Sequence, residues 1–194
     1  SPSQMAQPLL LASESKYRRE LLGRLGVPFA FHKPLFDEES AKNHSTNPSE
    51  LALFLAQQKA LSLQHKFPTH HILGGDQLVH FNGQILGKPL TIERAVDQLV
   101  LMSGQVHELI TAVAILKAQS TQGPSQFETY LHTTRLKMKK LSLSEIQDYV
   151  HLDLPLDCAG SYKIEKAGIA LFDHIETSDF TAIMGLPLMG VSTM

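Results

Sequence analysis

The order of apolar and polar positions predicts alternating strands and helices in the first third of the chain. Residues 8–12 and 27–32 are short apolar runs, and residues 17–25 between them have helical spacing that ends at a glycine. Runs of this length, bounded by turn residues, are typical of buried strands and short helices. After a polar loop, Asn47 precedes a proline and a helical pattern that continues to about Leu63, which is the arrangement of a capped helix.

The stretch 72–89 predicts a β-hairpin that brings a carboxylate close to a lysine. Residues 72–73 are interpreted as the end of a buried strand, and the two glycines that follow would let a ligand approach the backbone. The Asn-Gly dipeptide at 82–83 is favoured by two-residue hairpin turns. We therefore expect Asp76 and Lys88 to face one cleft. The alternative is an ordinary strand, turn and strand with a solvated aspartate and a solvated lysine.

Two long apolar strands are the main feature of the second half of the chain. Residues 106–116 and 127–138 have strand character, and the polar linker 120–124 between them predicts an antiparallel pair. Helices are expected at 91–104 and after Ser142, followed by a C-terminal segment rich in glycine and apolar residues. These elements predict an α/β fold with a mixed, strongly twisted β-sheet.

Composition and charge favour one globular domain that acts on small molecules. The chain has 194 residues, of which 43% are apolar and 19% charged, and its formal net charge is −2. Such a charge gives no long-range attraction to nucleic acid or to an anionic membrane, so neither is expected as a partner. We expect a single domain over residues 8–194, with residues 1–7 as an N-terminal extension or a remnant of cloning.

The cysteine content and the absence of long apolar runs predict a cytoplasmic location. Cys158 is the only cysteine, which excludes an internal disulfide and a cysteine-based zinc site and fits a reducing compartment. No apolar run has the length of a membrane span, and the first residues lack the charged and apolar regions of a signal peptide. A small buried thiol is a better interpretation of Cys158 than a nucleophile.

A candidate anion site lies where the first predicted strand meets the first predicted helix. Residues 13–19 include Ser13, Arg18 and Arg19, and free amides at a helix N-terminus attract anions. Consecutive arginines point in different directions on a helix, so at most one is expected to hold a phosphate while the other pairs within the protein. Two solvated surface charges are the alternative.

Other cations accompany this loop and indicate phosphate chemistry. Lys59, Lys88 and Lys163 lie next to predicted strand ends or glycine-rich turns, and several cations around Asp76 would suit a triphosphate and a metal. The chain lacks the phosphate-binding loop, the dinucleotide fingerprint, the serine nucleophile elbow and the His-Glu-x-x-His zinc helix. A metal-assisted hydrolase is the best remaining class.

Five motifs give the chain a resemblance to the Maf family of nucleoside triphosphate pyrophosphatases. They occupy residues 11–19, 75–77, 87–89, 158–163 and 185–187. The resemblance implies an elongated, two-lobed, inosine-triphosphatase-like α/β fold with a central cleft, and commonly a homodimer. It also implies hydrolysis of a nucleoside triphosphate to a monophosphate and pyrophosphate, with a divalent metal such as Mg²⁺ or Mn²⁺ as cofactor and the aspartate of the second motif as the catalytic carboxylate.

The chain departs from the usual family pattern at three positions. Lys16 stands where proline is usual, Gly75 replaces a common serine, and Ala112 replaces a common glycine. Loss of the serine hydroxyl removes a polar group beside the catalytic carboxylate, which bears on efficiency more than on the class of reaction.

Two positions predict which base is read. The branch of the family that resembles 7-methyl-GTP pyrophosphatases tends to have an aromatic residue and a glutamate where this chain has Tyr17 and Glu165. A methylated, positively charged guanine would stack on the tyrosine, and the carboxylate would accept from guanine N1–H and N2–H₂. Gln77 is a further candidate substrate contact. Alternatively, Tyr17 packs into the helix core and Glu165 pairs with Lys163 or Lys166.

The resulting hypothesis is hydrolysis of 7-methyl-GTP to 7-methyl-GMP and pyrophosphate in nucleotide-pool cleaning. Lys59, Lys88 and one arginine would hold the triphosphate, assisted by Ser13 and the loop amides, while Asp76 with Glu38 would hold the metal or orient water. A dTTP/UTP pyrophosphatase and a nucleotide-binding regulator of cell division with little turnover stay open as alternatives.

Overall fold

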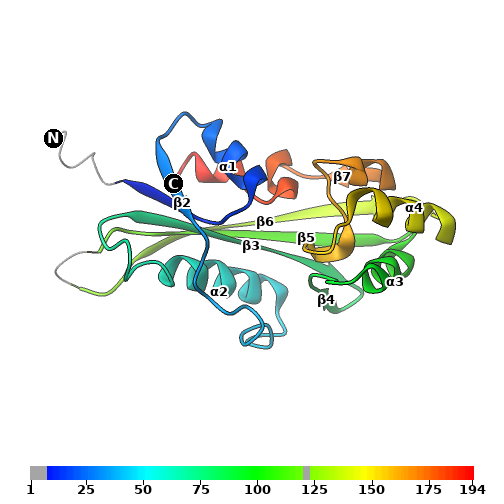
Figure 1. Cartoon of the computed structure of the whole chain (residues 1–194), viewed down its shortest axis with the longest axis horizontal. Helices are drawn as coiled ribbons and strands as arrows, with labels where there is room; N and C mark the ends of the chain where they lie inside the picture. Colours follow the sequence, from blue (N-terminus) through cyan, green and yellow to red (C-terminus); the bar gives the residue numbers. More distant parts are fainter. Residues whose placement is uncertain (1–7, 120–122) are drawn as a thin grey trace.

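Three long antiparallel strands run the length of the molecule and give it an elongated shape (Figure 1). The structure is a computed structural model that describes residues 8–119 and 123–194. The long strands are β3 (His71–Phe81), β5 (Val106–Leu116) and β6 (Phe127–Met138), so the predicted antiparallel pair is confirmed. The predicted N-terminal extension and residues 120–122 of the predicted linker lie outside the described residues.

The sheet is mixed, as predicted. Its order is β2-β1-β3-β5-β6-β7, with β4 paired to β3 off this path. β1 lies parallel to both β2 and β3, whereas β3, β5, β6 and β7 are antiparallel in succession. The shorter strands are β1 (Leu9–Ala12), β2 (Phe29–His32), β4 (Gln84–Leu86) and β7 (Phe172–Glu176).

The helices begin where the sequence predicts caps. Asn47, Thr91 and Ser142 each accept a hydrogen bond from the backbone amide three residues on, which satisfies an otherwise unpaired donor of the first turn. The helices are α1 (Lys16–Gly23), α2 (Pro48–Leu61), α3 (Ile92–Met102), α4 (Leu143–Asp153) and α5 (Leu188–Val191), with short 3₁₀ helices η1 (Ala159–Ser161), η2 (Ala167–Leu171) and η3 (Phe180–Met184). None of the helices in the described ranges has the length and apolar character that crossing a bilayer requires.

Separate apolar cores lie toward the two ends of the long strands, which gives the predicted two lobes. In one lobe, α3, α4 and β7 enclose a core that includes Leu99, Leu136 and Tyr149. In the other lobe, α1 and α5 lie on one face of the sheet and α2 on the opposite face (Figure 1). The long strands belong to both lobes and fix their separation.

The predicted end of a strand at residue 73 is wrong. β3 continues through both glycines to Phe81, so Asp76 lies in the middle of a strand. A Cβ atom at Gly74 would clash with the carbonyl oxygen of Ala56 in α2, whereas one at Gly75 would be 3.5 Å from the Ala112 oxygen, an ordinary contact. Gly74 therefore makes room for α2 and not for a ligand, and the structure leaves space for a side chain at position 75.

The C-terminal segment contains a strand that the sequence pattern did not predict. β7 has only five residues, and it pairs with the end of β6 across a register shift between Lys137 and Met138. Phe172 is the one residue of β7 that is fully buried. A strand this short with so little alternation lacks the period-two signal on which the prediction depends.

Replacing Gly74 by alanine is expected to lower the free energy of unfolding by about 1–3 kcal/mol, because the new methyl group must push α2 away from β3. Gly75→Ala is the matched control, since its methyl group meets only ordinary contacts. Chemical denaturation of both variants measures the difference. Equal stabilities would contradict the close approach of α2 at Gly74.

Candidate active site

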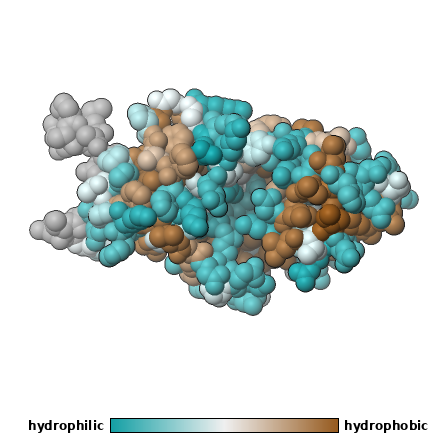
Figure 2. Space-filling model, in the orientation of Figure 1, coloured by the Kyte–Doolittle hydropathy of each residue, from teal (hydrophilic) through white to brown (hydrophobic). Residues whose placement is uncertain are grey.

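A cleft of about 580 Å³ lies between the two lobes. Figure 2 shows it as a hollow walled largely by hydrophilic residues. The loop before α1, the β2–α2 loop, β3, and the segments around η1 and η3 all contribute to its lining. Most of the predicted site residues line this one cleft, namely Ser13, Tyr17, Arg18, Glu38, Lys59, Asp76, Gln77, Lys88, Lys163 and Glu165.

The first wall of the cleft is the loop that leads into α1. Ser13 Oγ accepts from the amide of Ser15 at 3.0 Å, and Ser15 Oγ caps the helix by accepting from the amide of Arg18 at 3.3 Å. Arg18 Nε donates to the carbonyl of Gly185 at 3.2 Å. Gly185 has φ +105°, and a Cβ atom there would be 2.9 Å from Arg18 Nε, so glycine is needed for this contact.

The two arginines of this helix point to different places, as predicted. Arg18 lines the cleft, while the guanidinium carbon of Arg19 lies 4.1 Å from the centre of the Phe31 ring. That distance is typical of a cation–π contact. The structure therefore does not bring Arg19 to the cleft lining, and its predicted contact with phosphate has no support from the geometry.

A buried ion cluster occupies the floor of the cleft. Lys59 Nζ lies 2.8 Å from Asp76 Oδ1 and 2.8 Å from Glu38 Oε1, and it donates to the carbonyl of Gly75 at 3.3 Å. Lys88 Nζ is 3.6 Å from the other oxygen of Glu38. α2, β3, the β2–α2 loop and the segment after β4 thus meet at one cluster of charges.

The two carboxylates of this cluster differ in their ease of ionisation. Burial raises the pKa of Asp76 above its ordinary value even though Lys59 favours the charged form. Burial also opposes ionisation of Glu38, but the ammonium groups of Lys59 and Lys88 outweigh it and hold the pKa of Glu38 below its ordinary value. Asp76 is therefore the better general base, because a base works best when its pKa approaches the working pH.

Gln77 connects the floor of the cleft to the C-terminal wall. Its side-chain Nε2 donates to the carbonyl of Ala182 at 2.9 Å and is within 3.3 Å of the Ile183 carbonyl and 3.1 Å of Thr111 Oγ1. Thr111 donates to the same Ala182 carbonyl at 3.1 Å. The amide nitrogen of Gln77 is thus occupied by protein, and only its oxygen is available to a substrate.

The two residues predicted to read the base, Tyr17 and Glu165, also line the cleft. Tyr17 is half-buried, lines the cleft, and does not belong to the apolar core beside α1. Burial raises the pKa of Glu165, with partial compensation by the charges of Lys163 and Lys166. Among the described residues Glu165 forms no ion pair within 4 Å. Both side chains are placed for contact with a ligand.

Several residues of the lining were not predicted from the sequence. Lys16 and Lys33 are exposed cations at the cleft, and Tyr162 and Asp157 line its other lobe. Lys33 directly follows β2. A charged residue directly after a strand is the sequence signal that could have identified Lys33 as part of the cleft lining. Cys158 also lines the cleft, but burial raises the pKa of its thiol to about 12, which makes it a poor nucleophile.

The carboxylates of the ion cluster fit a hard divalent cation. No three His, Cys, Asp or Glu side chains gather as a complete metal site in residues 8–119 and 123–194. However, Asp76 Oδ2 is buried and has no hydrogen-bond partner in the part of the chain that the structure describes, and Glu38 is the second carboxylate at the same lysine. Mg²⁺ is commonly bound by one or two carboxylates together with substrate phosphates, so the donor set present is sufficient.

Comparisons with known proteins match the chain to one family and to several named relatives. The family model described as "Maf-like protein" matches residues 8–194. The 7-methyl-GTP pyrophosphatase of Bdellovibrio bacteriovorus is 51% identical over 181 residues, which are 93% of this chain and 92% of that protein. The 7-methyl-GTP pyrophosphatases of Pseudomonas putida and Pseudomonas savastanoi are 43% and 42% identical, each over 96% of this chain and 94% of the relative.

A buried histidine supports the cleft wall and predicts a pH effect on stability. His107 is 2% exposed, its Nε2 lies 2.8 Å from the hydroxyl of Tyr162, and burial lowers its pKa to about 4 from an ordinary 6.5. Between these pH values the unfolded chain binds the proton more readily than the folded protein, so stability falls as pH falls. We expect a loss of about 3 kcal/mol from pH 6.5 to pH 4 relative to His107→Gln.

Denaturation of both proteins across this pH range measures the effect of His107. The glutamine variant can still bond the Tyr162 hydroxyl and does not titrate, so the difference between the two curves isolates the imidazole. A difference that does not change with pH would show that His107 is accessible to protons in the folded state.

Proposed function

Because the chain belongs to the Maf family, we propose that it is a hydrolase that converts 7-methyl-GTP to 7-methyl-GMP and pyrophosphate. The observation that carries the proposal is that one cleft is lined by Tyr17, by Glu165 and by the Asp76 ion cluster. The names of the related pyrophosphatases agree with this substrate. Removal of a methylated nucleotide from the triphosphate pool would be its role.

The base would be recognised by charge and by hydrogen bonds. Methylation at N7 gives guanine a positive charge, which favours stacking on the aromatic face of Tyr17 and contact with a carboxylate. Glu165, when ionised, offers only acceptors and so matches the N1–H and N2–H₂ donors of guanine. A pyrimidine would leave this half-buried carboxylate poorly paired.

The triphosphate would extend from the base toward the ion cluster. Arg18, Lys88 and Lys163 line this path, and their charges would stabilise the negative charge that develops on the departing pyrophosphate. Ser13 and the amides at the start of α1 would add hydrogen bonds to a phosphate oxygen. Asp76 would either accept a proton from the attacking water, in keeping with a pKa that burial raises, or hold a divalent metal together with Glu38.

A divalent metal would be held by Asp76 and Glu38 together with phosphate oxygens. When bound, such an ion supplies charge stabilisation at the phosphate and lowers the pKa of water. The metal, a homodimer and a cytoplasmic location remain predictions, as do the roles of the individual site residues. A dTTP/UTP pyrophosphatase and a binding regulator without turnover are the alternatives that the following measurement separates.

A panel of nucleoside triphosphates tests the substrate. With Mg²⁺ or Mn²⁺ present, we expect kcat/KM for 7-methyl-GTP to exceed that for dTTP and UTP by about 10- to 100-fold, the discrimination that a bidentate contact provides. Glu165→Gln should reduce this preference about tenfold and leave dTTP turnover unchanged, because the amide replaces one acceptor by a donor. Faster hydrolysis of dTTP, or binding without pyrophosphate release, would refute the proposal.

Asp76→Asn tests the catalytic carboxylate. We expect pyrophosphate release to fall by about 10²–10⁴-fold, the usual contribution of a general base, while the thermal unfolding transition shows that the variant is folded. Asp148→Asn, the same chemical change on the exposed face of α4, is the matched control and should keep full activity. Substantial activity in Asp76→Asn would exclude the assigned role.

A further inference from the structure

The two lysines at the ion cluster have different surroundings. The side chain of Lys59 is 7% exposed, whereas that of Lys88 is 49% exposed. Lys59 makes short contacts to two carboxylates, while Lys88 has one looser contact of 3.6 Å. The sequence predicted one role, phosphate binding, for both lysines, and the geometry gives them different ones.

The hydrogen-bonding capacity of Lys59 is already used by the protein. A lysine ammonium has three N–H donors and no acceptor. Three oxygens surround the Lys59 nitrogen, those of Asp76 and Glu38 at 2.8 Å and the Gly75 carbonyl at 3.3 Å. A phosphate oxygen could bind this ammonium only by displacing one of them.

We propose that Lys59 is a positioning residue that holds Asp76 and Glu38 together, and that Lys88 is the lysine that binds the triphosphate. The proposal rests on the proposed function, because it assigns roles within that reaction. Lys59 fixes Asp76 through Oδ1 and leaves Oδ2 as the oxygen available for chemistry, since it is buried and has no partner among the described residues.

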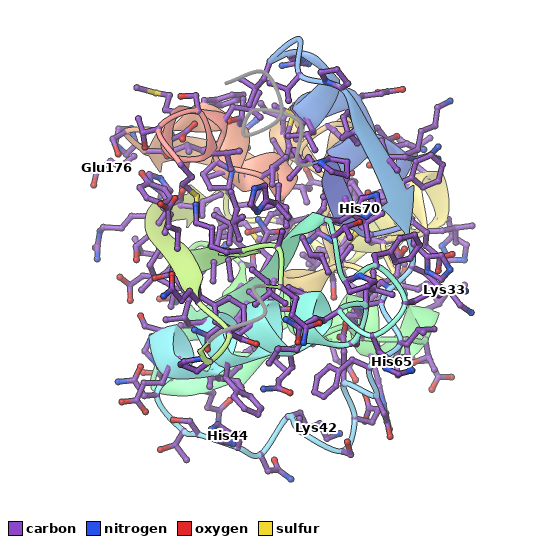
Figure 3. The ribbon with its side chains drawn as sticks, turned by 90° about the vertical axis from the view of Figure 1, so that its left-hand side faces the viewer. Lys33, Lys42, His44, His65, His70 and Glu176 are labelled. Atoms are coloured by element: carbon purple, nitrogen blue, oxygen red, sulfur yellow. The ribbon has the colours of Figure 1, made fainter. Side chains whose placement is uncertain are left out.

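Lys59 also holds the loop that supplies Glu38. This loop leaves β2 at Lys33 and passes around α2 by way of Lys42 and His44 (Figure 3), and the ring of His44 stacks on Phe54 of α2 with centroids 3.6 Å apart. Inside the cleft the loop is anchored by the ion pairs of Glu38 with Lys59 and Lys88. Without Lys59, two like charges would face each other at the cleft floor and repel.

Lys88 is suited to exchange partners. Its ammonium reaches the cleft from the segment after β4, and its contact with Glu38 is long and half-exposed, so replacing it by a phosphate oxygen costs little. Charge-assisted contacts to phosphate are stronger than such a surface pair. The triphosphate would thus replace Glu38 as the partner of Lys88, while Lys59 stays paired with Asp76 and Glu38.

Two charge-matched double variants test this division of roles. Lys59→Met/Glu38→Gln and Lys88→Met/Glu38→Gln each remove one positive and one negative charge, so general electrostatic attraction is equal. Calorimetric binding of inorganic tripolyphosphate in metal-free buffer reports the phosphate contact independently of the base and of catalysis. Lys59→Met leaves the buried Asp76 without its cation, and Glu38→Gln removes the second carboxylate that would face it. Circular dichroism verifies that each variant is folded.

We expect the Lys59 double variant to bind tripolyphosphate within about threefold of Glu38→Gln, and the Lys88 double variant to bind at least tenfold more weakly. In turnover, Lys59→Met should lower kcat about 100-fold with little change in KM, whereas Lys88→Met should mainly raise KM. Equal weakening of tripolyphosphate binding would overturn the proposal. If the wild type prefers another triphosphate, the proposed function fails while the tripolyphosphate comparison still decides the role of Lys59.

Discussion

The ammonium of Lys59, buried between two carboxylates, is the interaction on which the rest of the site depends. Charges removed from water are tolerated only when they are paired and hydrogen-bonded, and here one cation pairs with both Asp76 and Glu38. The pairing joins α2, β3 and the β2–α2 loop at a single point. Any change that moves one of these elements therefore changes the position of the carboxylates.

Packing between α2 and β3 is what allows Lys59 to reach this point. Gly74 lets the helix backbone approach the strand closely, and the next carbonyl, that of Gly75, accepts from the lysine. A residue with a side chain at position 74 would separate helix and strand. The two glycines thus have different roles. Gly74 sets the distance between α2 and β3, whereas the structure leaves space for a side chain at position 75.

Local signals were sufficient to predict most elements, and long-range contacts account for what was missed. The Asn82-Gly83 turn and the helix caps depend on neighbouring residues, so the sequence predicts them correctly. The extension of β3 past Leu73 depends on its pairing with β5, and the occupation of the Gln77 amide depends on η3, more than 100 residues away. Charge alone likewise could not distinguish Lys59 from Lys88, because their difference lies in burial.

The candidate site residues come from both lobes of the molecule. Asp76, Lys59 and Glu38 lie on elements anchored to α2 and β3, whereas Glu165 lies on the segment after η1, packed against α3 and α4. The long strands keep these two groups at a fixed spacing. A substitution at Glu165 is therefore expected to leave the ion cluster of Asp76, Lys59 and Glu38 undisturbed.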